Sequence, residues 1–284
     1  MEWKDNKNDK KYTLKSGYKL LDLKSPLVMG IINATPDSFY SESRKQSIKE
    51  VVNKVREMIA DGAKIIDIGG MSTRPNAEMI SIEEEIQRVT LVLESVREEF
   101  PEIWISLDTF RSEVVEACLE YKIDIVNDVT GGNGDSKMFD VVAKNKLTYI
   151  LMHSRGNPST MQSLTDYKNV VQDVVYELSL QIKKAEESGI KDIIVDPGFG
   201  FAKNLEQNYE LINRLDLFHE LNYPLLVGVS RKSMIYKLLD TSPEEAIHGT
   251  TTLNVLALQK GASILRVHDV KPAMECIKII GLPR

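Results

Sequence analysis

KIIDIG (64–69) and IWISL (103–107) are two short runs rich in Ile and Leu, and a helical pattern of apolar residues separates them. Within that pattern, residues 82–98, apolar side chains recur at Ile82, Ile86, Val89, Leu93 and Val96. This spacing is typical of an amphipathic helix. An apolar run with few polar breaks is typical of a parallel strand buried on both faces. These residues therefore predict a strand–helix–strand unit of an α/β fold.

The same unit recurs along the chain. Further apolar runs with the composition of buried strands are LVMGII (27–32), IDIVN (123–127), LTYILM (147–152), DIIVD (192–196), PLLVG (224–228) and SILRV (263–267). Helical patterns also occupy residues 46–61 and 168–188. Eight strands, each followed by a helix, are compatible with a closed barrel or with an open doubly wound sheet. The strand number, the length of 284 residues and the lack of a Gly-rich dinucleotide fingerprint after the first strand favour the barrel.

We therefore predict an α/β protein with a single (β/α)₈ TIM-barrel domain over residues 25–284. Residues 1–24 are expected to form a short N-terminal extension, a hairpin over the barrel floor. No apolar run is long enough to span a membrane, and the first residues, MEWKDNKNDKK, lack the apolar segment of a secretory signal. A net charge of −6 argues against nucleic acid as a partner. Cys118 and Cys276 lie too far apart in sequence for a CxxC site, so we expect a reducing, cytoplasmic setting.

Polar residues collect at the carboxyl ends of the predicted strands. They are Asn33, Asp67, Asp108, Asn127, Asp128, His153, Asp196, Ser230, Arg231, Lys232, Arg266 and His268. Active sites of TIM barrels lie at this end, with ligands held by several strands. A single Asp such as Asp67 is equally well explained as the N-cap of the next helix. Capping does not account for the Asn, Lys, Arg and His residues, so we expect an active site here.

This rim has two chemically different sides. Asp108, Asn127 and Asp196 offer acceptors and an amide, which suit a flat heterocycle whose edge carries several N–H donors. The last two strands carry the cationic and hydroxyl side chains, at the place where barrels commonly bind phosphate. In a closed barrel Asn33 on the first strand adjoins the last strand. Its amide oxygen is therefore a candidate ligand of Mg²⁺, which shares the phosphates of its substrates. Two loops, 33–44 and 69–79, are expected to close over the rim and exclude water.

Eight motifs, in order, resemble those of the dihydropteroate synthase family. They are MGIINATPDSF (29–39), IIDIGGMSTRP (65–75), SLDTFRS (106–112), VNDVTGG (126–132), MHSRGNPSTM (152–161), DPGFGFAK (196–203), VGVSRKSMI (227–235) and RVHDVK (266–271). The resemblance runs from about residue 25 to the C-terminus and implies a pterin-binding TIM barrel. It implies a transferase of folate biosynthesis that condenses 6-hydroxymethyl-7,8-dihydropterin pyrophosphate with p-aminobenzoate, giving 7,8-dihydropteroate and pyrophosphate. It also implies Mg²⁺ as cofactor, a homodimer, and inhibition by sulfonamides.

The resemblance also assigns residues to the ligands. Asp108, Asn127, Asp196 and Lys232 are implied to hydrogen-bond the pterin, with Met152 and Gly228 beside it and Arg266 stacked on its face. Asn33, Thr73, Arg74, His268 and Arg266 are implied to hold the pyrophosphate, with Asn33 as the Mg²⁺ ligand. Phe201, Ser230, Arg231, Lys232, Ser233 and Pro75 are implied to border p-aminobenzoate. The catalytic residues are then Asp108, Lys232 and Arg266, with Asp37 of the first loop as a further candidate.

Some positions depart from the family pattern. Met71 replaces a frequent Glu, Asn76 and Ala202 each replace a frequent Gly, and YSESR (40–44) replaces the usual glycine-containing continuation of the first loop. These changes bear on sulfonamide sensitivity and on loop closure more than on the reaction. Two alternatives remain open from the residues alone. One is a pterin-binding methyltransferase of the same barrel superfamily, which does not need the cationic residues; the other is a barrel that binds a pterin without catalysis.

Overall fold

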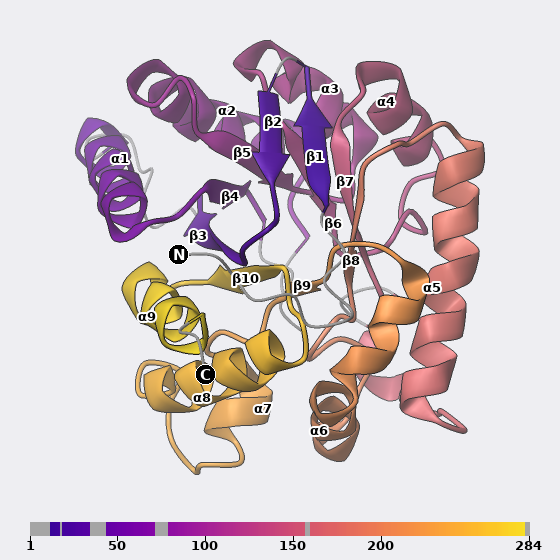
Figure 1. Cartoon of the computed structure of the whole chain (residues 1–284). Helices are drawn as coiled ribbons and strands as arrows, with labels where there is room; N and C mark the ends of the chain where they lie inside the picture. The colour runs from indigo at the N-terminus through magenta and orange to yellow at the C-terminus, as the bar shows by residue number, and fades with distance from the viewer. Residues whose placement is uncertain (1–11, 18, 35–43, 72–78, 157–159, 282–284) are drawn as a thin grey trace.

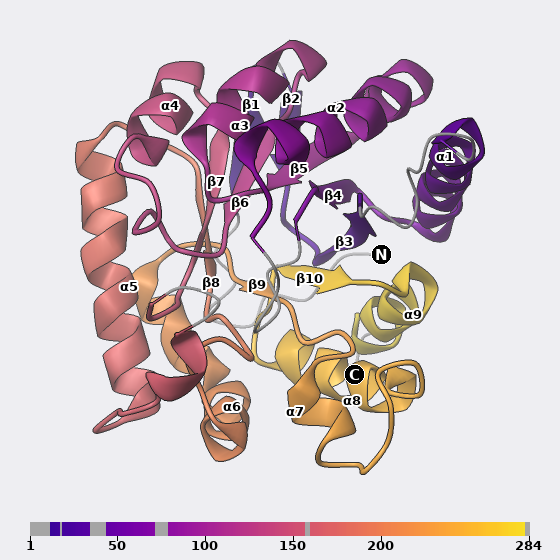
Figure 2. The same ribbon diagram turned by 180° about the vertical axis from the view of Figure 1, so that it is seen from behind.

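The computed structural model of the protein describes residues 12–17, 19–34, 44–71, 79–156 and 160–281. Eight parallel strands form one sheet surrounded by helices (Figures 1 and 2). The strands are β3 (Leu27–Asn33), β4 (Ile65–Gly69), β5 (Trp104–Asp108), β6 (Ile125–Asp128), β7 (Thr148–Met152), β8 (Ile193–Asp196), β9 (Leu226–Val227) and β10 (Ile264–Val267). Their order is β8-β7-β6-β5-β4-β3-β10-β9.

The two edges of this sheet meet. Val195 at the end of β8 forms a parallel bridge with Leu225, which directly precedes β9. The amide of Val195 donates to the carbonyl of Pro224 at 2.9 Å. The sheet is thereby nearly closed, and the predicted (β/α)₈ barrel is confirmed.

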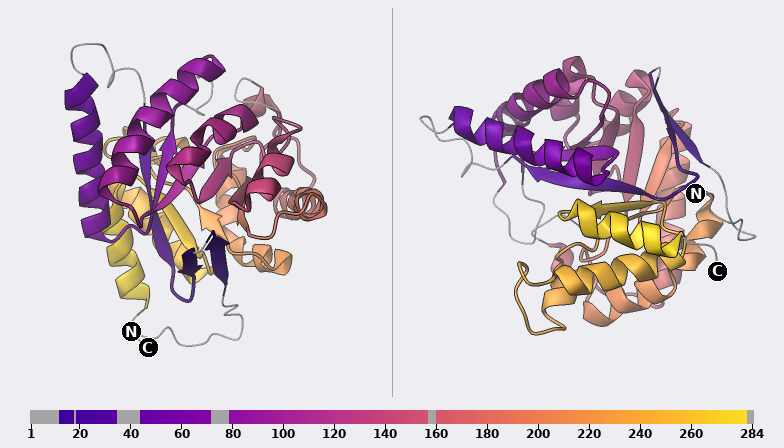
Figure 3. Two further views of the ribbon diagram at one scale, coloured as in Figure 1. Left: turned by 90° about the horizontal axis from the view of Figure 1, so that it is seen from above. Right: turned by 60° about the vertical axis from the view of Figure 1, so that its left-hand side comes forward.

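Helices follow every strand and form the outer ring. They are α1 (Arg44–Asp61), α2 (Ile82–Glu99), α3 (Ser112–Cys118), α4 (Met138–Asn145), α5 (Val170–Glu187), α6 (Leu205–Asn213), α7 (Ser233–Tyr236), α8 (Ile247–Gln259) and α9 (Val270–Ile280). Two of the long helices begin at side-chain caps: Ser81 Oγ accepts the amide of Glu84 before α2, and Asn169 Oδ1 accepts that of Gln172 before α5. The last helix, α9, packs against β3 and α1, so the end of the ring meets its beginning (Figure 3).

Two cores follow from the two-residue alternation of the strands. Outward side chains such as Val28, Ile66 and Leu107 pack against the helices in one large cluster. Inward side chains at the amino ends of the strands form a second cluster at the barrel floor. It contains Met29, Ile65, Trp104, Ile125, Ile150, Ile194, Leu226 and Ile264, one from each strand.

A short antiparallel hairpin, β1 (Thr13–Ser16) and β2 (Lys19–Asp22), lies across this floor (Figure 1). Its Leu14 and Leu21, with Leu23, pack into the floor cluster. The ammonium of Lys19 donates to the carbonyl of Ile103 at 3.2 Å and pairs with Asp124 at 3.3 Å. The hairpin therefore closes the barrel at the end opposite the polar strand ends. Within the described residues, every helix is too short or too polar to cross a lipid bilayer.

Candidate active site

The two-residue alternation of the strands brings several of the predicted site residues into one layer inside the barrel. Two positions beyond the floor layer, each strand again turns a side chain inward. This second layer consists of Ile31, Asp67, Ser106, Asn127, Met152, Asp196, Gly228 and Arg266. Asp108 follows two residues after Ser106, one layer nearer the mouth, and pairs with Asn127 in the register. Polar groups from strands distant in sequence therefore share the inside of the barrel mouth.

Arg266 connects two carboxylates at the centre of this layer. Its Nε donates to Asp67 Oδ2 at 2.6 Å, and a terminal guanidinium nitrogen donates to Asp108 Oδ2 at 2.6 Å. Asn127 Nδ2 donates to the same Asp67 oxygen at 3.1 Å. Burial disfavours the charge on Arg266, but the two carboxylates raise its pKa above the ordinary value. The guanidinium is thus held in one orientation by charge-assisted hydrogen bonds.

The other oxygen of each carboxylate has no hydrogen-bond partner in the part of the chain that the structure describes. Asp67 Oδ1 and Asp108 Oδ1 are buried and accept no hydrogen bond from the described residues. Asp67 is 1% exposed and Asp108 is 8% exposed. Burial, opposed by Arg266, raises the pKa of Asp108 to about 7. Buried polar atoms normally have partners, so these two acceptors suit the N–H donors of a ligand that enters the mouth.

The neighbouring wall is formed by Asp196 and Lys232. Asp196 Oδ1 accepts the amide of Gly198 at 2.7 Å, and burial, opposed by Lys232, raises the pKa of Asp196. The ammonium of Lys232 donates to the carbonyl of Phe199 at 2.5 Å and lies 4.7 Å from the centre of the Phe201 ring. Burial lowers the pKa of Lys232 to about 8. Phe201 packs against a small apolar cluster that also contains Met71, Phe110, Val129 and Met152.

The ends of β9 and β10 supply a second group of polar side chains. Ser230 Oγ accepts the backbone amide of His268 at 3.2 Å and lies 2.9 Å from His268 Nδ1. Burial, with Arg266 nearby, lowers the pKa of His268 to about 4, so this ring is neutral near pH 7. If the Ser230 hydroxyl donates to Nδ1, the Nε2–H of His268 is left as a donor. Ser233 begins α7 directly after Lys232.

Arg231 differs from its neighbours because its guanidinium is already engaged. Its Nε and one terminal nitrogen donate to the two oxygens of Asp269 at 2.8 and 2.9 Å, and it also donates to the carbonyls of Pro243 and Glu244. The residue has φ of 53°, the left-handed region that L residues seldom occupy. Its side chain is therefore held between the β10–α9 connection and the α7–α8 connection by several contacts.

The remaining expected residues fall into three groups. Asn33 ends β3 opposite Gly69, and its side chain is exposed at the rim. Asp128 has a local structural role, since it accepts from Thr130, Gly132 and the Tyr149 hydroxyl. The predicted Asp37, Thr73, Arg74 and Pro75 lie outside the described residues, as do the centres of both predicted loops.

Asp67 has a more central place than the sequence suggested. It is the third residue of β4, inside the barrel, and caps no helix, so the N-cap explanation of this residue is wrong. Lys203 is a second buried charge that was not among the expected site residues, although it ends the DPGFGFAK motif. The sequence feature that could have pointed to Lys203 is its place directly after the glycine-containing stretch DPGFGFA (196–202).

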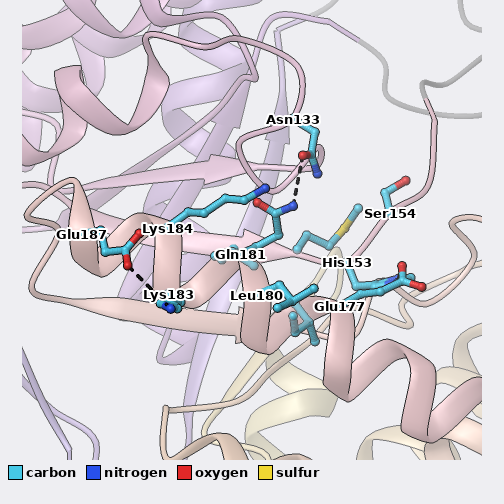
Figure 4. Close-up of a pocket in the computed structure, with 12 residues that line it drawn as sticks. Asn133, His153, Ser154, Glu177, Leu180, Gln181, Lys183, Lys184 and Glu187 are labelled. Carbon is cyan, nitrogen blue, oxygen red and sulfur yellow. Dashed lines mark hydrogen bonds and ion pairs between the residues drawn. The ribbon is translucent and has the colours of Figure 1, made fainter.

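A separate surface pocket lies outside the barrel, between β7 and α5 (Figure 4). Asn133 and Gln181, joined by a hydrogen bond of 3.1 Å, lie on one side of it. His153 and Glu177, 3.0 Å apart, lie on the other. The pocket is lined in part by Met152, the last residue of β7, and by His153, which follows it, so it adjoins the active-site wall from the outside of the barrel.

The fold and this mouth define a TIM-barrel enzyme whose mouth holds buried hydrogen-bond acceptors beside cationic side chains. Residues 29–268 match the protein family described as "Pterin binding enzyme". The dihydropteroate synthase of Escherichia coli (strain K12) is 44% identical over 262 residues, which cover 92% of this chain and 92% of that protein. The chain belongs to this pterin-binding enzyme family, and its activity is that of a dihydropteroate synthase.

Solved structures agree with this assignment. A Yersinia pestis dihydropteroate synthase in complex with a sulfonamide drug has a TM-score of 0.88 at 36% identity, covering 95% of this chain and 98% of that one. A Xanthomonas albilineans dihydropteroate synthase with 4-aminobenzoic acid has a TM-score of 0.87 at 34% identity, covering 95% of this chain and 97% of that one. The family and the transferase activity expected from the motifs are therefore confirmed.

Proposed function

We propose that the barrel mouth binds 6-hydroxymethyl-7,8-dihydropterin pyrophosphate against its carboxylate and amide wall and presents the exocyclic methylene to p-aminobenzoate. The observation that carries this proposal is the convergence of Asp108, Asn127 and Asp196 with Arg266 and Lys232 inside one barrel. The unpartnered Asp108 Oδ1 accepts from the pterin edge. Asn127, Asp196 and Lys232 complete the polar contacts to the ring.

The pterin faces are covered by Met152 and Arg266. Met152 is 3% exposed and lies in the layer of Asn127 and Asp196. Gly228 lies beside the aliphatic part of Arg266, since a Cβ built there would stand 3.8 Å from Arg266 Cβ, in ordinary van der Waals contact. Arg266 stacks on the ring while its bonds to the two carboxylates fix its plane, because a guanidinium combines stacking with directed donors. Its charge also faces the pyrophosphate.

The leaving pyrophosphate is held at the cationic corner, by Asn33, His268 and Arg266 together with Thr73 and Arg74 of the second loop. Asn33 fits a Mg²⁺ ligand because it offers one exposed amide oxygen at the rim, and Mg²⁺ typically takes few protein ligands and keeps waters and phosphate oxygens. Among the described residues there is no group of three His, Cys, Asp or Glu that could hold a metal ion by themselves. When bound, Mg²⁺ supplies Lewis-acid stabilisation of the departing pyrophosphate.

The p-aminobenzoate site lies beside the pterin, bordered by Phe201, Ser230, Lys232 and Ser233, with Pro75 of the second loop. Arg231 borders it through its backbone, which donates to Thr250 Oγ1 at 3.0 Å while its side chain holds Asp269. The Phe201 ring, packed on the cluster around Met71 and Val129, provides an apolar surface for the benzene ring.

The reaction is substitution at the exocyclic methylene of the pterin. The C–O bond breaks first, and its electron pair leaves with pyrophosphate. The electron-rich dihydropterin ring delocalises the resulting positive charge, which Asp108 and Asp196 stabilise from preorganised positions. The arylamine nitrogen then forms the C–N bond and releases its proton to water, so the path is S_N1-like and needs no strong general base. Asp37 of the first loop is a further candidate for stabilising the cation or the amine.

The assay that tests this function measures pyrophosphate release with both substrates and Mg²⁺. Release that requires p-aminobenzoate distinguishes the synthase from a methyltransferase and from a barrel that only binds a pterin. Arg266→Ala is expected to weaken the pterin pyrophosphate more than the free pterin alcohol. Equal losses for the two ligands would contradict a contact of Arg266 with the pyrophosphate.

The assembly and chain organisation belong to the same proposal. We place the catalytic domain at residues 25–284 of a cytoplasmic homodimer, with residues 1–24 as an extension. Leu238 and Leu239, which follow α7, and Ile279 on α9 are exposed and supply apolar surface that a dimer would cover. Sedimentation at several protein concentrations tests the dimer, and a monomer at all of them would contradict it.

A further inference from the structure

Lys203 is a lysine buried in the wall behind the active site. The whole residue is 3% exposed. Its ammonium donates to the carbonyl of Gly198 at 3.0 Å, to the carbonyl of Phe201 at 2.9 Å and to His153 Nδ1 at 3.0 Å. An ammonium has three donors, so all of them are used. Burial lowers the pKa of Lys203 to about 7, which reflects how unfavourable this environment is for a charge.

The segment that Lys203 holds has an irregular backbone. Gly198, Gly200 and Ala202 have φ of 71°, 80° and 50°, so every second residue is left-handed. Such a backbone cannot satisfy its own carbonyls through a regular ladder. Side chains supply the bonds instead. Besides Lys203, Lys232 donates to the carbonyl of Phe199, and the Tyr167 hydroxyl donates to the carbonyl of Ala202. Asn208 Oδ1 accepts the amide of Gly200.

His153 extends the same network to the outer helices. Its Nδ1 accepts from the Lys203 ammonium, so its Nε2 carries the proton and donates to Glu177 at 3.0 Å. Burial and Lys203 together lower the pKa of His153 to about 4, which keeps the ring neutral. Glu177 on α5 also pairs with Arg155. A continuous series of contacts therefore joins α5 to the carbonyl of Phe201.

We propose that Lys203 is a positioning residue for the p-aminobenzoate wall. It fixes the carbonyls on both sides of Phe199–Gly200 and thereby sets the place of the Phe201 ring and of the Lys232 ammonium above it. The inference rests on the proposed contact between Phe201 and p-aminobenzoate. Among the described residues, the hydrogen bonds of Lys203 go to Gly198, Phe201 and His153. Asp108 and Asn127, on β5 and β6, lie outside this network, whereas Asp196 and Lys232 adjoin it, so we expect a smaller effect on the pterin than on p-aminobenzoate.

Lys203→Met tests the proposal, since it keeps the chain length and removes all three donors. We expect the KM for p-aminobenzoate to rise about tenfold, equivalent to ~1.4 kcal/mol. The KM for the pterin pyrophosphate should change by less than about threefold, below ~0.7 kcal/mol. Lys19→Met is the matched control. It also removes a mostly buried lysine, with a side chain 11% exposed, that donates to a carbonyl at the opposite end of the barrel.

The two variants separate positioning from simple stability. Lys19→Met should lower the melting temperature and leave both KM values unchanged. If Lys203→Met behaves the same way, with both KM values equal to those of the wild type, Lys203 supports only folding and the proposal is overturned. A wild-type enzyme without p-aminobenzoate-dependent pyrophosphate release would instead refute the proposed function.

A measurement on the unaltered protein keeps the test valid if Lys203→Met does not fold. Long-range ¹H–¹⁵N spectra report which ring nitrogen of each histidine carries the proton, and the chain has only 4 His. The His153 signals, assigned by their loss in His153→Gln, should show a protonated Nε2 and an unprotonated Nδ1. A proton on Nδ1 would exclude the bond from Lys203 and refute the network on which the proposal depends.

Discussion

Replacing Asp67 tests whether the orientation of Arg266 is set by a residue that was not among the predicted ligand contacts, although it lies in the same layer as Asn127 and Asp196. One oxygen of Asp67 accepts both Arg266 Nε at 2.6 Å and Asn127 Nδ2 at 3.1 Å. Asp67→Asn can keep both bonds through its amide oxygen but removes the negative charge. Asp67→Ala removes the acceptor and leaves both donors buried without it.

The structure gives different magnitudes for the two variants. Hydrogen bonds to charged groups contribute about 1.5–3 kcal/mol and neutral ones about 1 kcal/mol, so Asp67→Asn should weaken the Arg266 contact by about 1–2 kcal/mol. Breaking a buried ion pair by removing one partner costs about 3–5 kcal/mol, which is the expectation for Asp67→Ala. If this loss falls on transition-state binding, kcat/KM drops about tenfold in Asp67→Asn and by a hundredfold or more in Asp67→Ala, at about 1.4 kcal/mol per tenfold.

The assay is steady-state pyrophosphate release, with urea unfolding of the same samples to separate stability from catalysis. Asp124→Asn is the control, because Asp124 is also buried, accepts from Arg97, Lys19 and the Ile105 amide, and lies at the barrel floor. It should lower stability and leave kcat/KM of the folded enzyme unchanged. Equal kcat/KM values for Asp67→Asn, Asp67→Ala and the wild type would refute the role assigned to Asp67.

Three further predictions concern pH, backbone strain and the metal. Asp108 must be ionised to accept from the pterin, and Lys232 must stay protonated. The value of kcat/KM should therefore rise with pH through about 7, as Asp108 ionises, and fall above about 8, as Lys232 loses its proton. An acidic limb that persists in Asp108→Asn would contradict the assignment of that limb to Asp108. Ala202→Gly should stabilise the protein by about 0.5–1 kcal/mol in urea unfolding, since Ala202 has φ of 50°. Ala143→Gly in α4 is the control, and it should destabilise the protein by about 1 kcal/mol. If both variants are less stable than the wild type, the backbone at Ala202 is not strained. Chelation of Mg²⁺ should abolish pyrophosphate release. In calorimetry it should weaken the binding of the pterin pyrophosphate but not of the free pterin. Equal binding of the pterin pyrophosphate with and without chelator would argue against the metal site.

The fold was predictable because its signals are local and repeated. Every predicted apolar run overlaps a strand of the barrel, to within a residue at its end, including PLLVG (224–228), where only Leu226–Val227 is a regular strand. Pro224 lacks an amide and shortens this strand, yet its carbonyl makes the bond that brings the sheet edges together. The helix over residues 82–98 was predicted within a residue of α2, since its apolar repeat agrees with the cap at Ser81.

The candidate site was predictable in its place but not in its pairing. The two-residue alternation fixes which side chains face inward, so Asp108, Asn127 and Asp196 could be assigned to one mouth from their positions alone. The carboxylates that bind Arg266 are determined by the stagger between neighbouring strands in the closed barrel. The apolar runs of the sequence do not reveal this stagger. Asp67 was therefore left with two explanations until the register was known. The direction of the Arg231 side chain depends on its bond to Asp269, 38 residues later, and could not be predicted from the sequence for the same reason.

Closure of the barrel and assembly of the site are consequently one event. Arg266 meets Asp67 across 199 residues of sequence, and the bond forms only when β10 has paired with β3. Until then Arg266 and both carboxylates remain hydrated, and their burial is favourable only when all three are in contact. The apolar floor, covered by Leu14 and Leu21 of the hairpin, supplies the burial that offsets the cost of desolvating these charges. Among the described residues Asp108 keeps a buried oxygen without a partner, and an acceptor of this kind favours a ligand with an N–H donor, because an unsatisfied buried acceptor carries its full desolvation penalty.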